Sequence, residues 1–136
     1  MATFSEPLMV AVVEDDPRIR QLIEDEVVDE GHRVDSFSTA EAFLEVFKAE
    51  RFDLVLLDLM LPGMNGLACL KAMTSQAGDR NALPLVVMVT ALNDSDMKRQ
   101  TLEAGASDYI LKPDLFVRLP ELLQNLRESP ATEPSR

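Results

Sequence analysis

Residues 52–63 decide the fold, and they read Phe52-Asp53-Leu54-Val55-Leu56-Leu57-Asp58-Leu59-Met60-Leu61-Pro62-Gly63. The apolar run predicts a buried strand, and Pro62 and Gly63 indicate a turn shortly after it. A charge at the end of such a strand, here Asp58, is expected at the C-terminal edge of a parallel sheet, where α/β folds keep their binding crevices. Taken alone, such an aspartate is more often a turn residue or a helix cap, so its meaning depends on the rest of the chain.

Short strand-like runs alternate with helical patterns along the whole chain, which is typical of a parallel sheet covered on both faces. Five βα units predict an α/β, doubly wound, three-layer (βα)5 sandwich of the flavodoxin-like kind. The strand order 2-1-3-4-5 is expected by analogy with known doubly wound sheets. The second strand is the most polar and is expected at an edge. The five strands are expected at residues 8–13, 33–37, 54–57, 84–89 and 109–111.

The first helix is expected to begin at Asp16, a plausible cap, with Pro17 in its first turn. Gly31 is placed to end that helix, and His32, which follows it, is expected at the surface. The apolar residues at helical spacing form the predicted buried stripe, namely Ile19, Leu22, Ile23 and Val27.

Three further helix boundaries follow from local signals. Ser38 and Glu41 form a possible capping box for the second helix. Asn93, Asp94 or Ser95 could cap the fourth helix. Pro120 would break the last helix if it lay in the interior, so we expect it in the first turn, after an irregular lead-in at 114–118.

The composition limits the classes of function that the chain can have. The chain has 136 residues and a formal net charge of −11, so direct binding to nucleic acid, which needs cationic groups, is not expected. It has no apolar run long enough to span a membrane, and its N-terminus does not resemble a signal peptide. A single cysteine, Cys69, fits a reducing compartment, so a cytoplasmic location is expected. We expect an N-terminal arm at 1–7, one folded domain at 8–128, and a disordered tail or linker at 129–136.

Polar side chains stand at the end of four predicted strands. The first strand delivers Glu14 and Asp15, the third Asp58, the fourth Thr90 and the fifth Lys112. In the order 2-1-3-4-5 these four strands are neighbours, so their ends should meet in one crevice. The second strand lies outside that set and ends in Phe37, which offers no comparable group.

The residue types in this crevice indicate phosphoryl transfer to a carboxylate. Clustered carboxylates stay ionised only beside a cation, and oxygen ligands without histidine or cysteine favour Mg²⁺ or, as an alternative, Mn²⁺. A lysine supplies a point charge for a phosphoryl group, and a threonine hydroxyl can bind another of its oxygens. Asp58 would then be the nucleophile.

These motifs also resemble those of the response-regulator receiver domain, over about residues 8–128. The resemblance rests on four blocks in order: Val12-Val13-Glu14-Asp15-Asp16-Pro17, residues 56–66 around Asp58, Val89-Thr90-Ala91, and residues 105–113, which end in Leu111-Lys112-Pro113. It implies that Asp58 accepts a phosphoryl group from a sensor histidine kinase or a histidine phosphotransfer protein.

The resemblance also assigns the metal ligands. It implies that Asp15 binds Mg²⁺ directly, Glu14 binds it through water, and Asp58 and the backbone carbonyl of Met60 complete the protein ligands.

The remaining roles concern the phosphoryl group and the switch. The resemblance implies that Lys112, the Thr90 hydroxyl and the Ala91 N–H contact the phosphoryl oxygens, and that Thr90 and Tyr109 carry the switch. It also implies a cis bond between Lys112 and Pro113.

Other polar residues have plainer interpretations. Asp16 is expected to cap a helix, and Asp53 to be structural at the opposite edge of the sheet. Cys69 is expected in the core. Met60 and Leu92 are apolar at positions two residues after Asp58 and Thr90, which leads to the hypothesis that the phosphoaspartate hydrolyses slowly because water is excluded.

Two alternatives remain beside the switch. A phosphorylation-independent interaction module would bind partners without the chemistry, but Asp58, Thr90 and Lys112 argue against it. A phosphatase of the haloacid dehalogenase type needs a second aspartate where Met60 stands. We expect no enzyme activity beyond self-phosphorylation and slow self-dephosphorylation. Output is expected from a partner or a fused domain, and dimerisation is open.

Overall fold

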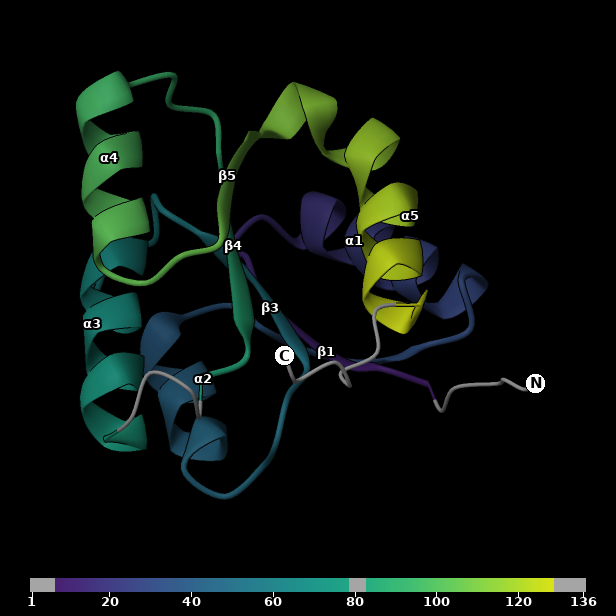
Figure 1. Cartoon of the computed structure of the whole chain (residues 1–136), viewed down its shortest axis with the longest axis horizontal. Coiled ribbons are helices and arrows are strands. Elements are labelled where there is room, and N and C mark those ends of the chain that lie inside the picture. The colour runs from purple at the N-terminus through teal and green to yellow at the C-terminus, as the bar shows by residue number, and fades with distance from the viewer. Residues whose placement is uncertain (1–6, 79–82, 129–136) are drawn as a thin grey trace.

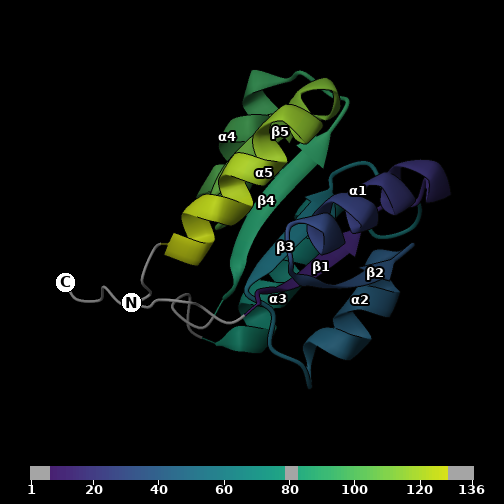
Figure 2. The same ribbon diagram turned by 90° about the vertical axis from the view of Figure 1, so that its right-hand side faces the viewer.

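The protein, described here by a computed structural model over residues 7–78 and 83–128, is built on a five-stranded parallel sheet in the order β2-β1-β3-β4-β5 (Figures 1 and 2). This confirms the predicted architecture and strand order. The arm predicted at 1–7, apart from Pro7, and the tail predicted at 129–136 lie outside the described residues. The strands are β1 (Met9–Val13), β2 (Arg33–Phe37), β3 (Leu54–Asp58), β4 (Leu85–Thr90) and β5 (Asp108–Leu111).

Helices cover both faces of the sheet and make the three layers (Figures 1 and 2). One face carries α1 (Pro17–Asp29) and α5 (Lys112–Glu128). The other carries α2 (Ala40–Phe47), α3 (Gly66–Ala77) and α4 (Ser95–Glu103). Within the described residues, none of these helices has the length and apolarity that crossing a membrane requires.

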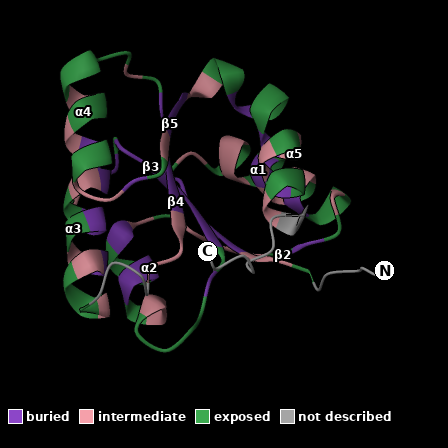
Figure 3. Ribbon diagram, in the orientation of Figure 1, coloured by how far each residue is buried: buried purple, intermediate pink, exposed green. Residues whose placement is uncertain are grey.

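The core consists of two apolar layers, one on each face of the sheet. Alternate residues of β1, β3 and β4 enter each layer, and these strands are buried on both sides (Figure 3). This is why their sequences are apolar throughout rather than alternating. On the α2–α4 side Phe43, Leu70 and Met73 fill the layer, and on the α1–α5 side Ile23 and Leu119 do so. Tight packing on both faces holds the strand ends in fixed relation.

The strand register brings the functional strand ends to one level. Val13 pairs with Leu57, so Glu14 and Asp58 follow side by side on β1 and β3. Asp58 pairs in turn with Val89, immediately before Thr90 on β4. Thr90 pairs with Leu111, immediately before Lys112. β2 lies at the edge of the sheet, as predicted from its polar sequence.

Helix α1 begins and ends as the sequence predicted. Asp16 caps α1 by accepting a hydrogen bond from the Arg18 N–H, and Gly31 follows the helix with a φ of 90°. Asp94 is the cap of α4, which decides between the three candidates for that position.

The predicted cap of α2 was wrong. Thr39, not Ser38, caps the helix, because its hydroxyl accepts a hydrogen bond from the Ala42 N–H. Glu41 does not turn back to the cap as a capping box requires. Its carboxylate instead accepts a hydrogen bond from the Met64 N–H at 3.2 Å, in the loop after β3. The Glu41 side chain thus binds a residue that is distant in sequence, whereas the local pattern had predicted a contact with the start of its own helix.

The start of α5 differs from the prediction in two respects. The helix begins at Lys112, so 114–118 is helical and Pro120 lies in the helix interior. The Lys112–Pro113 bond is trans, not cis. Because the helix starts at Lys112, Pro113 occupies the first turn, where a missing N–H costs nothing. The interior proline costs about 3 kcal/mol, but Leu115 and its helical neighbours on the buried face offset this, since each stabilises the fold by about 1.5–3 kcal/mol.

Two predictions of exposure were also wrong. His32 is only 5% exposed, and Leu22 of the predicted apolar stripe is 55% exposed. The stripe of α1 is narrower than its sequence suggests, since Ile23 and Val27 carry the buried contact. His32 is buried because its Nδ1 accepts a hydrogen bond from the Leu8 N–H at 2.9 Å, which anchors the start of β1 to the turn before β2.

We therefore expect His32→Leu to lower the free energy of unfolding by about 1–3 kcal/mol, because the Leu8 N–H loses this acceptor. Asparagine can place its Oδ1 near the position of Nδ1, so His32→Asn should recover part of the loss. Urea unfolding at neutral pH measures both variants. Equal destabilisation of the two would show that ring packing, not the hydrogen bond, is what matters.

Candidate functional site

Three carboxylates lie together at the C-terminal edge of the sheet. Glu14, Asp15 and Asp58 each offer one oxygen, and these three atoms lie within 4.8 Å of one another. Glu14 and Asp58 are each 2% exposed, whereas Asp15 is exposed. The ends of β1 and β3 thus place two buried acids and one accessible acid at the same point, as the sequence predicted.

Lys112 joins this cluster from the far end of the chain. Its Nζ lies 3.2 Å from Oδ2 of Asp58 and 3.1 Å from Oε1 of Glu14. Burial lowers the pKa of Lys112, but its contacts with the Glu14 and Asp58 carboxylates outweigh burial, so the net shift of the pKa is upward. The lysine therefore stays charged between two acids.

Asp58 is held in a tight backbone environment. Its Oδ1 accepts a hydrogen bond from the Met60 N–H at 3.0 Å. The start of α3 presses against its carbonyl, since a Cβ on Gly66 would lie 2.4 Å from the Asp58 carbonyl oxygen. Only glycine fits at that approach. The nucleophile predicted from the sequence is thus fixed on two sides by main chain.

Burial and the charge of Glu14 raise the pKa of Asp58 from its ordinary 3.8 to about 6. The Met60 N–H and Lys112 act in the opposite direction but do not cancel this rise. Without a further cation, Asp58 is therefore only partly stabilised as the anion that a nucleophile must be.

The donor set fits a divalent cation bound by oxygen ligands. Oε2 of Glu14 accepts hydrogen bonds from the Asp16 N–H and from Lys112. Oε1, although buried, accepts no hydrogen bond from the described residues, and its 3.1 Å approach to Lys112 is an ion pair without hydrogen-bond geometry. Lys112 thus gives this oxygen a nearby positive charge but no hydrogen bond, and a bound metal ion could supply the missing contact. Mg²⁺ accepts such a set, with waters filling its other positions.

Thr90 and Tyr109 meet at one residue of the β4–α4 loop. The Thr90 hydroxyl oxygen accepts a hydrogen bond from the Leu92 N–H at 3.0 Å. The Tyr109 hydroxyl donates to the Leu92 carbonyl at 2.7 Å, and the tyrosine is 8% exposed. Burial, and then the charge of Asp94, raises the pKa of Tyr109, so the hydroxyl remains a donor. Ala91, between Thr90 and Leu92, is exposed.

The plainer interpretations of three other residues agree with their surroundings. Asp16 is a helix cap. Asp53 accepts a hydrogen bond from the Met9 N–H at the opposite end of the strands. Cys69 is fully buried, and burial, with the charge of Glu41, raises the pKa of its thiol to about 12, so it is no nucleophile.

Two side chains hold the site's loops through contacts that were not predicted from the sequence. Arg20 of α1 donates from Nη1 to the Glu14 carbonyl at 2.8 Å, and Glu41 of α2 binds the loop after β3. The available signal was helical spacing, because Arg20 lies one turn after the capping Asp16 and so faces the same loop.

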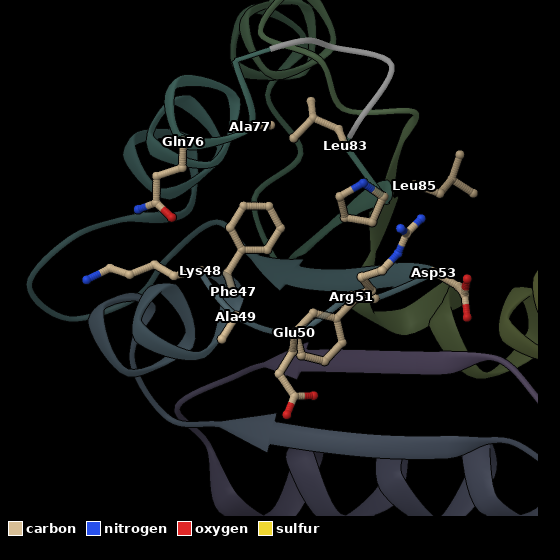
Figure 4. Close-up of a pocket in the computed structure, with 12 residues that line it drawn as sticks. Phe47, Lys48, Ala49, Glu50, Arg51, Asp53, Gln76, Ala77, Leu83 and Leu85 are labelled. Atoms are coloured by element: carbon tan, nitrogen blue, oxygen red, sulfur yellow. The ribbon is translucent and has the colours of Figure 1, made fainter.

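The site does not coincide with the more voluminous hollow of the molecule. A cavity of about 510 Å³ lies at the opposite edge of the sheet, lined by residues 47–53, 76–77 and 83–85 (Figure 4). Figure 4 shows the charged ends of Lys48, Glu50 and Asp53 pointing to different sides of this hollow. A smaller hollow of about 320 Å³ is lined by residues that include Leu59 and Met60, which directly follow Asp58, together with Leu92 and Met97. The candidate site is therefore identified by the acids and the lysine that meet there, not by the volume of a hollow.

A family model of the response regulator receiver domain matches residues 10–127. The chain belongs to this family. Of the curated relatives, the DNA-binding response regulator MtrA of Mycolicibacterium smegmatis is 34% identical over 126 residues, which cover 90% of this chain and 53% of MtrA. The chain spans about half or less of the length of the curated relatives that it matches.

Solved structures agree with the family and the fold. The beryllofluoride-activated receiver domain of Klebsiella pneumoniae RstA is 34% identical, with a TM-score of 0.76 and coverage of 88% of this chain and 99% of that one. The receiver domain of the sensor histidine kinase PA1611 of Pseudomonas aeruginosa, which has a magnesium ion in its active-site cleft, is 25% identical, with a TM-score of 0.77 and coverage of 88% and 97%.

The raised pKa of Asp58 predicts how stability changes with pH in metal-free protein. Between the unfolded pKa of about 4 and the folded pKa of about 6, the native state binds more protons than the unfolded state, so stability falls as pH rises. Asp58→Asn removes this dependence. The variant should therefore match the wild type near pH 4 and exceed it by roughly 1–3 kcal/mol above pH 6.

Denaturant unfolding in EDTA across that pH range measures the difference. Adding MgCl₂ at pH 7 should narrow the gap, because a bound cation stabilises only the wild-type carboxylate. A gap between the two proteins that does not change with pH would contradict the assigned titration.

Proposed function

We propose that this chain is a phosphoacceptor in a two-component phosphorelay, in which Asp58 takes a phosphoryl group from a phosphohistidine of a histidine kinase or histidine phosphotransfer protein. The supporting observation is the position of Asp58, buried between two further acids and in contact with Lys112. Family membership supports the same function.

Asp58 supplies the attacking oxygen. Its Oδ1 is fixed by the Met60 N–H and its Oδ2 by Lys112, so the carboxylate presents one orientation to the phosphorus. The new O–P bond forms as the N–P bond of the phosphohistidine breaks, and the electron pair of that bond returns to the imidazole of the partner.

The cation site would be formed by Glu14, Asp15 and Asp58, with the Met60 carbonyl. Mg²⁺ bound there would neutralise charge on the phosphoryl oxygens and on the carboxylates. Lys112 would leave its ion pair with Asp58 to contact a phosphoryl oxygen, and Glu14 would retain it nearby.

Thr90 and the Ala91 N–H would bind the remaining phosphoryl oxygens. Because the Thr90 oxygen already accepts from the Leu92 N–H, its own proton is available to donate. Leu92 also receives the Tyr109 hydroxyl, so a change at Thr90 would be transmitted to Tyr109 and α4 through that backbone. The phosphoryl group would thereby shift an existing equilibrium between two states that partners distinguish.

The chain would be a switch and not an enzyme acting on other molecules. A haloacid dehalogenase phosphatase requires a second aspartate two residues after the first. Met60, which is 59% exposed, stands at that position and has no carboxylate. The intact contacts of Lys112 with the acids argue against a phosphorylation-independent module. We also place the chain in the cytoplasm, which the unpaired, buried Cys69 supports.

Phosphorylation is testable with small donors. We expect acetyl phosphate with Mg²⁺ to add one phosphoryl group to the wild type, and Asp58→Asn to take none, because asparagine lacks the nucleophilic oxygen. Intact-mass spectrometry measures the product, with Asp53→Asn as the control at the opposite edge of the sheet. An unmodified wild type, or a modified Asp58→Asn, would reject the proposal.

The apolar surroundings predict a long-lived phosphoaspartate. Met60 and Leu92 both line the smaller hollow, and because their side chains are apolar neither can orient an attacking water. Met60→Asn combined with Leu92→Glu should speed the loss of phosphate by roughly tenfold or more, because a well-positioned proton acceptor can contribute roughly 10²–10⁴-fold. The decay is followed after removal of the donor, with the exposed Val28→Asn on α1 as control. An unchanged rate in the double variant would dismiss the hypothesis.

A further inference from the structure

Asp15 is the least constrained member of the acidic cluster. It is exposed, and no described residue donates a hydrogen bond to its carboxylate, whereas Glu14 and Asp58 are held by several groups. The direction of the Asp15 side chain therefore depends on its backbone, that is, on the loop between β1 and α1.

That loop is fixed on both sides of Asp15. The Glu14 N–H donates to the Phe37 carbonyl of β2 at 3.0 Å, and the Asp16 N–H donates to the Glu14 carboxylate at 3.0 Å. The Asp16 carbonyl accepts from the Arg20 N–H at 2.9 Å, as the first turn of α1 requires. These contacts place the residues before and after Asp15 but leave the peptide unit between Glu14 and Asp15 to be set by another group.

The Arg20 side chain supplies that contact. Its Nη1 donates to the Glu14 carbonyl at 2.8 Å, in a half-buried position. Because the peptide unit is planar, fixing the carbonyl oxygen of Glu14 also orients the plane that contains the nitrogen and the Cα of Asp15. The guanidinium thus acts on Asp15 through the main chain, without touching its carboxylate.

The positive charge of Arg20 has the opposite consequence. A cation near three carboxylates repels a divalent ion, so loss of charge alone would strengthen metal binding. The two effects of Arg20 on metal affinity therefore differ in sign, and substitutions can separate them. Arg18 is the matched comparison, because it lies on the same turn, its side chain is 89% exposed, and it pairs with Asp16 rather than with the Glu14 backbone.

We propose that Arg20 is a positioning residue for the divalent-cation site, which holds the Glu14–Asp15 peptide so that the Asp15 carboxylate faces Glu14 and Asp58. The inference rests on the proposed function, since it assumes that these acids bind Mg²⁺. It adds a residue of α1 to the site and explains how an exposed acid keeps its direction.

Calorimetric titration of metal-free protein with MgCl₂ tests this. Arg20→Gln should weaken Mg²⁺ binding roughly tenfold, the lower end of the range for groups that orient metal ligands. Arg20→Lys keeps the charge but not the reach, and should also weaken binding. Arg18→Gln removes the same charge and should leave affinity unchanged or slightly stronger. Arg20→Gln binding as tightly as Arg18→Gln, or more tightly, would overturn the proposal.

A second measurement separates positioning from general loss of structure. The rate of phosphorylation by acetyl phosphate in Arg20→Gln should return to the wild-type value at saturating Mg²⁺, because only the affinity for the cation has changed. A rate that stays low at every Mg²⁺ concentration would contradict the assigned role. If Arg20→Gln does not fold, Arg20→Lys provides the same two readouts. A wild type that binds no Mg²⁺ rejects the proposed function itself, whereas normal wild-type binding with unchanged Arg20 variants rejects only this inference.

Discussion

The burial of two carboxylates beside one lysine is the constraint on which the rest of the structure depends. Lys112 contacts Glu14 and Asp58, which are 98 and 54 residues earlier in the chain. The single positive charge of Lys112 cannot balance the negative charges of two buried acids and an exposed third. Burial and the charge of Glu14 accordingly raise the pKa of Asp58 to about 6. The fold keeps the cluster in place because the strands that end in these residues are packed on both faces. The negative charge that Lys112 does not balance would favour a divalent cation at this site, as the proposed function requires.

Much of the fold could be predicted because its signals are local and repeated. The apolar runs of β1, β3 and β4 are buried on both faces and need no partner to be recognised. The errors came where a tertiary contact overrode a local signal. Glu41 binds Met64 instead of its own helix end, and His32 is buried because it accepts from Leu8. Pro120 remains inside α5 because fully buried leucines on either side of it hold the helix to the sheet.

The site was more predictable than the details of the fold. The last residues of parallel strands lie at the same edge of the sheet. Once the strands are known, the residues that follow them can therefore be predicted to lie close together. That reasoning finds Glu14, Asp58 and Lys112, which belong to strand ends. It cannot find Arg20, whose guanidinium reaches a backbone carbonyl from the first turn of α1. Residues that bind main chain leave no complementary side chain in the sequence, so helical spacing indicates the loop that Arg20 faces but not the carbonyl that it binds.

The backbone of Leu92 links Thr90, at the candidate site, to Tyr109 on β5, again through main-chain hydrogen bonds. Its N–H is held by Thr90 at the site, and its carbonyl is held by the buried Tyr109 hydroxyl. Both bonds therefore constrain the backbone of one residue, which lies just before the cap of α4 at Asp94. A phosphoryl group that drew the Thr90 hydroxyl toward itself would reorient a segment whose other anchor is Tyr109. Because the interior is close-packed, such a segment has few alternative positions, and a small displacement becomes a change between discrete states.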